Sequence, residues 1–298
     1  MYPLLSLAMA LSSLRKRLLF NPAAKSYGPF LLSTSPTIAE LLAGSGYSHI
    51  VVDMEHSSLD ISSTASMLRA IDSYSPPQGK ASPTPIVRAP SCNDVATTKR
   101  ILDVLRLPGG IIFPMVETAE DARKAVASTR YPPHYGRGEG TRGCAYTMVR
   151  ASQYGRNEQY YDSSCHEDLL TIVQVESEEA IHNIPEIGMV EGVDCIFLGP
   201  FDISCSIGEM GDFSEDGKVM KLLRHAEQLV RKTSRKKRER SSDGSGLILG
   251  GFRSPGRTLE EMFSKEVSYQ LVSGSVDLSM LAKAAADDLK EAEKAMGI

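Results

Sequence analysis

Eight short runs of aliphatic and β-branched residues recur along the chain, with helix-like stretches between them. Residues 50–52 and 195–198 are apolar at every position, which is typical of strands buried on both faces of a parallel sheet. Strand and helix alternate eight times in this length of chain, and that pattern predicts an α/β fold made of one closed (β/α)8 TIM barrel. The predicted strands cover residues 30–32, 49–53, 85–88, 110–113, 171–175, 194–198, 246–249 and 269–273.

Four of the stretches between these runs show clear helical patterns, at residues 37–43, 63–71, 95–105 and 119–128. Asp94 stands just before the third pattern, and we expect it to cap the first turn of that helix. The whole of residues 23–298 is expected to form the barrel domain.

The first residues, 1–22, form a separate segment in which a short apolar stretch precedes three basic residues. A secretory signal has the opposite order, with its charge before the apolar core. We expect an amphipathic helix packed on the barrel. A cleaved organelle presequence is the alternative, because the segment contains Arg and Ser and lacks acidic residues.

Composition excludes several classes of protein. The chain has 298 residues, is 42% hydrophobic, and carries a net charge of -4, so a nucleic-acid partner is a poor expectation. Its five cysteines have no CxxC pair, which indicates reduced thiols in a cytoplasmic compartment, with a mitochondrial location as the alternative. No apolar run approaches the roughly 20 residues that a membrane span needs.

Two segments interrupt the regular alternation. Residues 130–155 are too long for a plain connection after the fourth strand, and we expect a functional loop or lid there. Residues 231–246 contain RKTSRKKRER followed by SSDGSG. Such a charge run is usually a solvated helix end that leads into a flexible loop, and a localisation signal or an anionic contact is the alternative.

Polar residues at the carboxyl ends of the strands are the candidates for chemistry, because a TIM barrel carries its active site there. Glu176 ends the fifth predicted strand and Asp202 follows the sixth. Two such carboxylates form a hard-oxygen site that suits magnesium or manganese, while the alternative is a pair of exposed rim carboxylates with basic partners. The predicted strand ends carry Asp53, Glu55, His56, Arg88, Gln174, Glu176 and Asp202.

Arg88 and His56 are expected to complete the site. Arg88 ends an apolar strand, where a guanidinium either stabilises a developing oxyanion or forms a structural ion pair with Asp53 or Glu55. His56 is a candidate general base or proton shuttle, oriented by Asp53. Removing a proton from a pyruvate-type methyl group creates an enolate, whose charge enzymes stabilise with either a Lys Schiff base or a metal ion. No predicted strand end carries a Lys, so a metal ion is favoured.

At these residues the sequence resembles the HpcH/HpaI aldolase family, the class II pyruvate aldolases that include 4-hydroxy-2-oxoheptanedioate aldolase and 2-dehydro-3-deoxyglucarate aldolase. The resemblance extends from about residue 14 to the C-terminus and rests on six ordered blocks. The blocks are VVDMEHSSLD (51–60), PIVRAPSCND (85–94), FPMVETAEDARKAV (113–126), RYPPHYGRGEGTRG (130–143), TIVQVESEEA (171–180) and EGVDCIFLGPFDIS (191–204).

The resemblance implies a barrel of the phosphoenolpyruvate/pyruvate type with Mg²⁺, Mn²⁺ or Co²⁺ bound by Glu176 and Asp202. It implies that Arg88 steadies the enolate oxygen and that His56 with Asp53 manages the proton. A 2-oxo acid substrate would chelate the metal, its carboxylate would meet backbone N–H groups around Phe201 and Asp202, and Gln174 would line the same pocket.

Other implications concern assembly and specificity. Members of the family are commonly hexamers built from dimers that exchange their last helix, so residues 277–290 are expected to pack on a neighbouring copy. Phe201 stands where a small residue is usual in the GP-x-D block, which puts the identity of the aldehyde in question.

The expected reaction is metal-dependent retro-aldol cleavage of a 4-hydroxy-2-oxo acid to pyruvate and an aldehyde. An oxaloacetate decarboxylase, or a synthase that uses the same enolate, is one alternative. A coenzyme A thioester lyase of the citrate lyase beta type is another, although no sequence feature demands a groove for the nucleotide. A catalytically silent scaffold is the third, and the retention of Arg88, His56, Glu176 and Asp202 argues against it.

Overall fold

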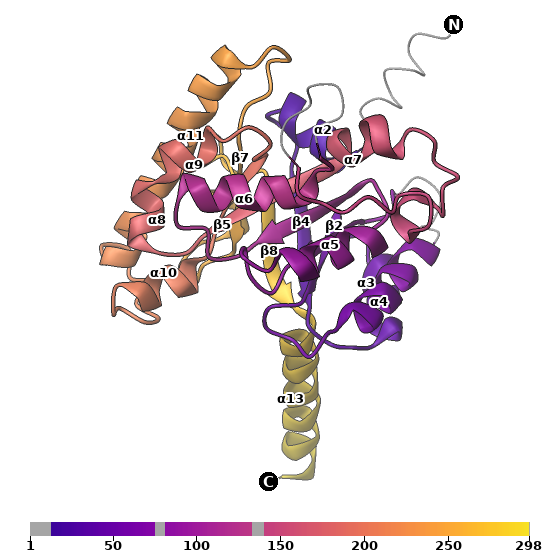
Figure 1. Ribbon diagram of the computed structural model, residues 1–298. Coiled ribbons are helices and arrows are strands. Elements are labelled where there is room, and N and C mark those ends of the chain that lie inside the picture. Colours follow the sequence, from indigo (N-terminus) through magenta and orange to yellow (C-terminus); the bar gives the residue numbers. More distant parts are fainter. Residues whose placement is uncertain (1–12, 75–80, 133–139, 298) are drawn as a thin grey trace, which may run out of the picture.

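Eight parallel strands close into a barrel in which each strand pairs with the next along the chain and the last pairs with the first (Figure 1). The computed structural model describes residues 13–74, 81–132 and 140–297. The predicted TIM barrel is therefore confirmed, and every predicted strand overlaps an observed one. The strands are β1 (Ser26–Leu31), β2 (His49–Asp53), β3 (Thr84–Arg88), β4 (Gly109–Phe113), β5 (Leu169–Val175), β6 (Cys195–Leu198), β7 (Ile248–Phe252) and β8 (Leu271–Val276).

Helices surround the barrel, and the four helices predicted in the first half are present. Asp94 caps the third of them as expected, because its carboxylate accepts a hydrogen bond from the Thr97 N–H at 2.9 Å. The helical elements are α2 (Leu14–Phe20), α3 (Pro36–Gly44), α4 (Ile61–Ser73), α5 (Val95–Val104), α6 (Ala119–Thr129), η1 (Arg150–Ser152), η2 (Tyr160–Ser164), α7 (Cys165–Glu167), α8 (Glu178–His182), α9 (Ile184–Gly188), α10 (Pro200–Ser206), α11 (Lys218–Arg240), α12 (Leu259–Phe263) and α13 (Asp277–Met296).

The alternation of side chains along the strands decides which polar residues reach the mouth of the barrel. Val51 of β2 packs inside the barrel, while its two chain neighbours pack between the barrel and the helices. Since the side-chain period of a strand is two, Asp53 follows Val51 into the interior. Arg88 follows Ile86 in β3 by the same rule, and Gln174 does so in β5. These three polar side chains therefore form the last interior layer at the carboxyl ends of the strands.

Helix α2 closes the other end of the barrel. Three leucines of α2 are almost fully buried and join the interior cluster. Arg15 fixes the helix from outside, because its Nε and one Nη donate to the two Asp194 oxygens at 2.8 and 2.9 Å. The predicted N-terminal helix is thus present. Residues 1–12, which bear on the presequence alternative, lie outside the described residues.

The segment predicted to be a lid lies away from the mouth. It connects α6 to β5, so its described parts, residues 130–132 and 140–155, lie at the amino-terminal ends of the strands. There the buried Arg142 guanidinium lies over the rings of Tyr131 and Tyr160, at 4.7 and 5.7 Å from their centroids. A lid over the chain's own mouth is therefore a wrong prediction for these residues, and residues 133–139 lie outside the described part.

The basic run ends α11, as the charge pattern predicts, but it is not wholly solvated. Lys237 turns inward, and its ammonium donates to the carbonyls of Gly188, Val190 and Val193 at 2.8, 3.1 and 2.6 Å. Burial lowers the pKa of Lys237 to about 8. One member of the run is thus a structural anchor for the chain around α9.

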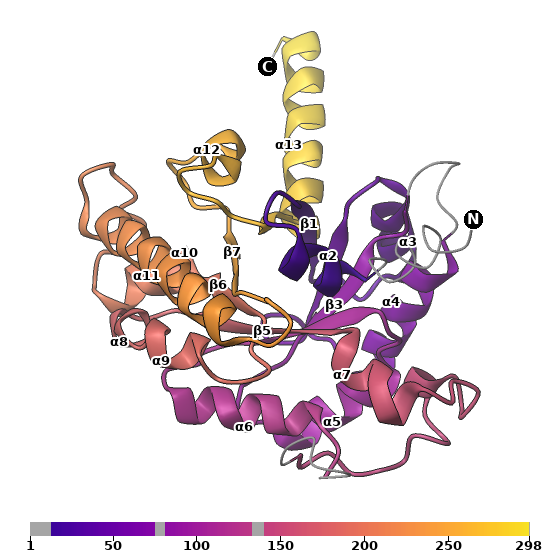
Figure 2. The ribbon, with the colours of Figure 1, turned by 90° about the horizontal axis from the view of Figure 1, so that it is seen from above.

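Helix α13 stands clear of the barrel in both ribbon views (Figures 1 and 2). Only its first residue, Asp277, is buried, and the rest of the helix is largely exposed. Among the described residues no helix combines the length and apolarity that crossing a membrane would need.

Candidate active site

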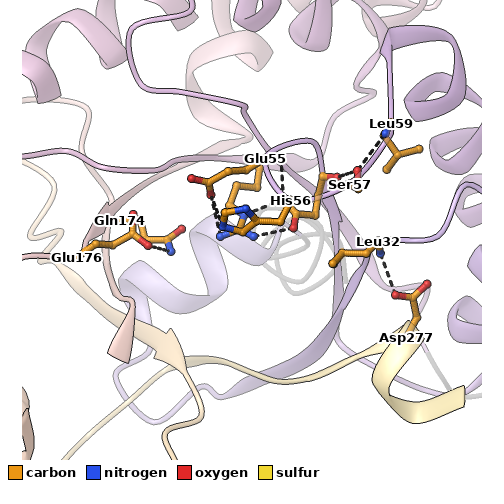
Figure 3. A network of polar contacts seen from close by, with 10 residues as sticks. Leu32, Glu55, His56, Ser57, Leu59, Gln174, Glu176 and Asp277 are labelled. Atoms are coloured by element: carbon orange, nitrogen blue, oxygen red, sulfur yellow. Dashed lines mark hydrogen bonds and ion pairs between the residues drawn. The ribbon is translucent and has the colours of Figure 1, made fainter. Parts of the chain in front are cut away.

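A cavity of about 270 Å³ opens at the carboxyl ends of the strands. All the predicted site residues except Glu176 line it directly, and Glu176 lies immediately beside Gln174 (Figure 3). The cavity is lined by Phe30, Leu32, Asp53, His56, Arg88, Gln174, Gly199, Pro200, Phe201, Asp202, Phe252 and Val276.

Arg88, the last residue of β3, is held by two carboxylates at the end of the neighbouring strand β2. It is paired in register with Asp53, and its Nε and one Nη donate to the two Asp53 oxygens at 2.8 and 2.6 Å. Its other Nη lies 2.9 Å from Glu55 Oε2. Asp53 is fully buried, so this bidentate pair is a rigid part of the mouth. The ion pair that the sequence left open is therefore present.

His56 lies at the edge of the cavity, with a side chain that is 60% exposed. Its Nε2 is 3.8 Å from Glu55 Oε2 (Figure 3). The predicted orienting partner, Asp53, is instead occupied by Arg88 and by the Glu55 N–H at 3.0 Å. His56 is therefore free to turn towards a ligand, with Glu55 as its nearest acid.

Glu176 is a buried carboxyl group with an acidic neighbour. The Met115 N–H donates to its Oε2 at 2.8 Å, and the Gln174 amide donates to its Oε1. Burial raises the pKa of Glu176 to about 8, the Met115 N–H opposes that rise, and the Asp202 carboxylate, within side-chain hydrogen-bonding range, adds to it. Two neighbouring carboxyl groups that interact in this way compete for one proton or share one cation.

The surroundings of this pair fit a divalent cation. A Cβ at Gly199 would lie 2.7 Å from Glu176 Oε1, so only glycine leaves the carboxylate in this position. The Oε1 atom of Gln174 is buried and has no hydrogen-bond partner, which leaves an acceptor for a bound molecule. Within the described ranges no group of three or more His, Cys, Asp or Glu could bind a metal together. The site thus offers two protein ligands and open positions for oxygen atoms of water or substrate.

The start of α10 contributes the backbone on the other side of the cavity. Gly199 and Pro200 begin the helix, and no side chain caps it. The N–H groups of Phe201 and Asp202 belong to the first turn, where an α-helix leaves them without an intrahelical acceptor. Phe201 itself is 42% exposed, and its ring packs edge-on against Phe213 at a centroid distance of 5.2 Å.

The residues that sequence reasoning missed are apolar or act through the backbone. The polar strand ends predicted one side of the mouth, which we call the polar arc. It consists of Asp53, His56, Arg88, Gln174, Glu176 and Asp202. The opposite side, which we call the apolar arc, consists of Phe30, Leu32, Phe201, Phe252 and Val276. Of these only Phe201 was predicted, and the other four lie in β1, β7 and β8 or directly after β1. Met115 was missed because it acts through its backbone N–H, which donates to Glu176, and because its positive φ of 52° is not predictable from a Met in the sequence.

Comparison with known proteins shows the family and the fold. The chain is 33% identical over 258 residues to a 4-hydroxy-2-oxo-heptane-1,7-dioate aldolase of Escherichia coli, which covers 87% of each chain. It shares a TM-score of 0.79 and 32% identity with an HpcH/HpaI aldolase/citrate lyase family protein from Burkholderia cenocepacia, over 94% of this chain and 98% of that one. An HpcH/HpaI aldolase from Desulfitobacterium hafniense shares the fold, with a TM-score of 0.75 at 23% identity, over 94% of this chain and 96% of that one. Residues 26–243 match the model of one family, and the chain belongs to it: HpcH/HpaI aldolase/citrate lyase.

Proposed function

We propose that this chain catalyses the reversible retro-aldol cleavage of a 4-hydroxy-2-oxo acid to pyruvate and an aldehyde. The observation that carries the proposal is the pair of neighbouring carboxyl groups at the mouth of the barrel, Asp202 in the cavity lining and Glu176 beside Gln174. The name of the aldolase from Escherichia coli, at 33% identity, supports the same reaction class.

Glu176 and Asp202 would hold a divalent cation such as Mg²⁺, Mn²⁺ or Co²⁺. When bound, such a cation would polarise a 2-oxo group and stabilise negative charge that develops on its oxygen. The buried Gln174 amide would fix the same end of the substrate, and the N–H groups of Phe201 and Asp202 would receive its carboxylate.

Cleavage breaks the bond between C3 and C4 of the substrate. A base takes the proton of the C4 hydroxyl group, the C4 oxygen forms the aldehyde carbonyl, and the electron pair of the broken bond moves into C3–C2 and onto the C2 oxygen. C3 then accepts a proton and becomes the methyl group of pyruvate. His56 would move these protons, and the support for this role is its exposed ring at the cavity edge beside Glu55.

Arg88 would act by charge rather than by proton transfer. It supplies a fixed positive charge next to the interior layer in which the enolate oxygen develops. Asp53 is best described as a positioning residue, because its carboxylate holds the Arg88 guanidinium through two hydrogen bonds.

The assembly that we propose is a homo-oligomer, a hexamer or another arrangement based on dimers, in which α13 packs on another copy. The support is the helix itself, which leaves its own barrel after Asp277 and exposes Leu278, Leu281, Leu289 and Met296. A monomeric mass for the full chain in light scattering would overturn this assembly, and a Leu281→Lys variant with a lower mass than the wild type would support it.

The test of the function is pyruvate release from several 4-hydroxy-2-oxo acids and from oxaloacetate, with and without a chelator. We expect turnover of 4-hydroxy-2-oxo acids that the chelator abolishes and that Mg²⁺, Mn²⁺ or Co²⁺ restores. Turnover that resists the chelator would contradict the role of the carboxylate pair. Consumption of oxaloacetate alone would make the chain a decarboxylase instead.

A further inference from the structure

The two arcs of the mouth differ in chemistry, and the difference bears on the substrate. The polar arc surrounds the carboxylate pair, where the reacting carbons of a 2-oxo acid would lie. The apolar arc faces it across the cavity from β7, β8 and β1, which are neighbours in the closed barrel. A substrate bound by its 2-oxo acid end would therefore extend its other end along the apolar arc.

The apolar arc is built to present hydrocarbon surface. Phe252 packs edge-on against Phe30 at a centroid distance of 5.4 Å, and Leu32 and Val276 are half-buried beside them. Phe201 completes the arc with a ring that is 42% exposed although Phe213 supports it. Such partly exposed apolar side chains gain free energy when an apolar ligand removes them from water.

The charges of the mouth disfavour a second anionic group on the substrate. Arg88 is the only Arg or Lys among the described residues that line the cavity, and its three nitrogens are already directed at Asp53 and Glu55. Four carboxyl groups lie in the cavity lining or next to it, those of Asp53, Glu55, Glu176 and Asp202. A distal carboxylate would therefore be desolvated without a cation to pair with.

We infer that the aldehyde portion of the substrate is uncharged and apolar, so that the site prefers 4-hydroxy-2-oxo acids with an aliphatic or aromatic end over those that end in a second carboxylate. This inference rests on the proposed function and names its substrate class. It also separates this chain from the relative whose name specifies a dioate.

The test uses the reverse reaction, in which pyruvate adds to an aldehyde. 4-Methylpentanal and succinate semialdehyde form a matched pair, because the first carries an isopropyl group where the second carries a carboxylate. We expect kcat/KM for the full-length enzyme to be at least about tenfold higher with 4-methylpentanal. An equal or higher kcat/KM with succinate semialdehyde would overturn the inference.

Two variants of Phe252 test whether the apolar arc sets this ratio. Phe252→Ala should lower the preference for 4-methylpentanal by about threefold or more, and Phe252→Lys should raise kcat/KM with succinate semialdehyde by supplying the missing cation. Met148→Ala, an exposed side chain outside the cavity, is the control and should leave the ratio unchanged. Failure of both Phe252 variants to change the ratio would contradict the assignment.

Arg253 offers the route by which the opposite result would arise. It follows Phe252, is exposed, and does not line the cavity, while its Nε donates weakly to the Arg257 carbonyl at 3.4 Å. If succinate semialdehyde is preferred and Arg253→Ala removes that preference, Arg253 binds the distal carboxylate and the inference is wrong. We expect Arg253→Ala to leave the ratio near that of the wild type.

A second readout keeps failure of the inference apart from failure of the proposed function. Exchange of the pyruvate methyl protons with deuterium, followed by NMR, needs enolate formation and no aldehyde. Absence of exchange in the metal-supplied enzyme would refute the proposed function. Exchange together with a preference for succinate semialdehyde would leave the function in place and refute only the substrate class.

Discussion

The polar arc and the apolar arc lie at the ends of strands of the same barrel, yet they are held in place by different forces. In the polar arc Asp53, Arg88, Gln174 and Glu176 are fixed by hydrogen bonds, such as those from Arg88 to Asp53 and from Met115 to Glu176. In the apolar arc the side chains are held by packing, as in the contact of Phe252 with Phe30. Packing tolerates a change of shape far better than a hydrogen-bonded charge tolerates the loss of its partner.

This difference indicates how the two arcs divide the work. The polar arc must keep its geometry for the reaction to occur, so that substitutions there should abolish turnover or destabilise the fold. The apolar arc can vary without loss of the chemistry, and it is therefore the place where substrate preference is set. Substitutions that change turnover, stability or substrate preference separately will test this division.

The largest effect is expected from the carboxylate pair. Glu176→Gln should lower kcat/KM by about 1000-fold or more, because it would remove a ligand of the proposed cation and with it several kcal/mol of transition-state stabilisation. Glu120→Gln on the exposed surface of α6 is the matched control and should retain activity. Isothermal titration with Mn²⁺ should show weaker binding by the Glu176 variant. If the Glu176 variant binds Mn²⁺ tightly and keeps full activity, Glu176 has no part in the reaction.

The next effect is on stability, through the pair formed by Asp53 and Arg88. Arg88→Met should lower the free energy of unfolding by about 3–5 kcal/mol, because it leaves the fully buried Asp53 without its partner. The double variant Asp53→Leu/Arg88→Met should recover part of that loss. Arg123→Met, which breaks an exposed pair with Glu120, is the control and should cost less than about 1 kcal/mol. Urea denaturation measures all three, and equal losses would show that burial of the pair is unimportant.

A smaller effect is expected away from the mouth, where the buried His49 at the start of β2 links β1 and β8. Its ring nitrogens lie 2.7 Å from Ser26 Oγ in β1 and 3.1 Å from Ser273 Oγ in β8. Burial lowers the pKa of His49 to about 3 from 6.5. Below pH 6.5 the unfolded chain therefore binds a proton that the folded chain does not. The free energy of unfolding should decrease as the pH is lowered, by about 2 kcal/mol at pH 5.

Urea denaturation at pH 7.5, 6 and 5 measures this slope. His49→Gln should flatten it, while His225→Gln on the exposed face of α11 should leave it as in the wild type. A wild-type stability that does not change between pH 7.5 and 5 would show that His49 is not a buried neutral group.

The smallest effect is expected where α13 anchors the apolar arc. The Asp277 carboxylate accepts a hydrogen bond from the Leu32 N–H at 2.9 Å (Figure 3). It accepts another from the Ser33 N–H at 3.0 Å. Asp277→Asn should cost about 1 kcal/mol of stability, because the amide can accept only one of the two bonds. It should also raise KM a few-fold with kcat nearly unchanged. Asp287→Asn, exposed on the same helix, is the control. A lower kcat with unchanged KM would place Asp277 in the chemistry instead.

The sequence was sufficient for the barrel because the strands are apolar on both faces and the helices between them have clear periodicity. It was also sufficient to predict that Asp53, Arg88 and Gln174 lie together at the mouth, because the alternation of side chains and the strand ends can be read from the sequence. It left open whether Arg88 pairs with Asp53 or with Glu55, and it wrongly expected Asp53 to orient His56, because two acids and a His lie within four residues. It also could not give the apolar arc, because Phe252 and Val276 look like ordinary strand residues until the barrel closes.

Helix α2 closes one end of the barrel, and this determines the order in which the two products can leave. Since the floor of the barrel is sealed by leucines, every molecule enters and leaves through one opening. The aldehyde would lie against the partly exposed Phe201, whereas pyruvate would lie deeper, beside the nearly inaccessible Glu176. Release should therefore be sequential, with the aldehyde departing first. Product inhibition by pyruvate should then be competitive with the substrate, and inhibition by the aldehyde should be noncompetitive.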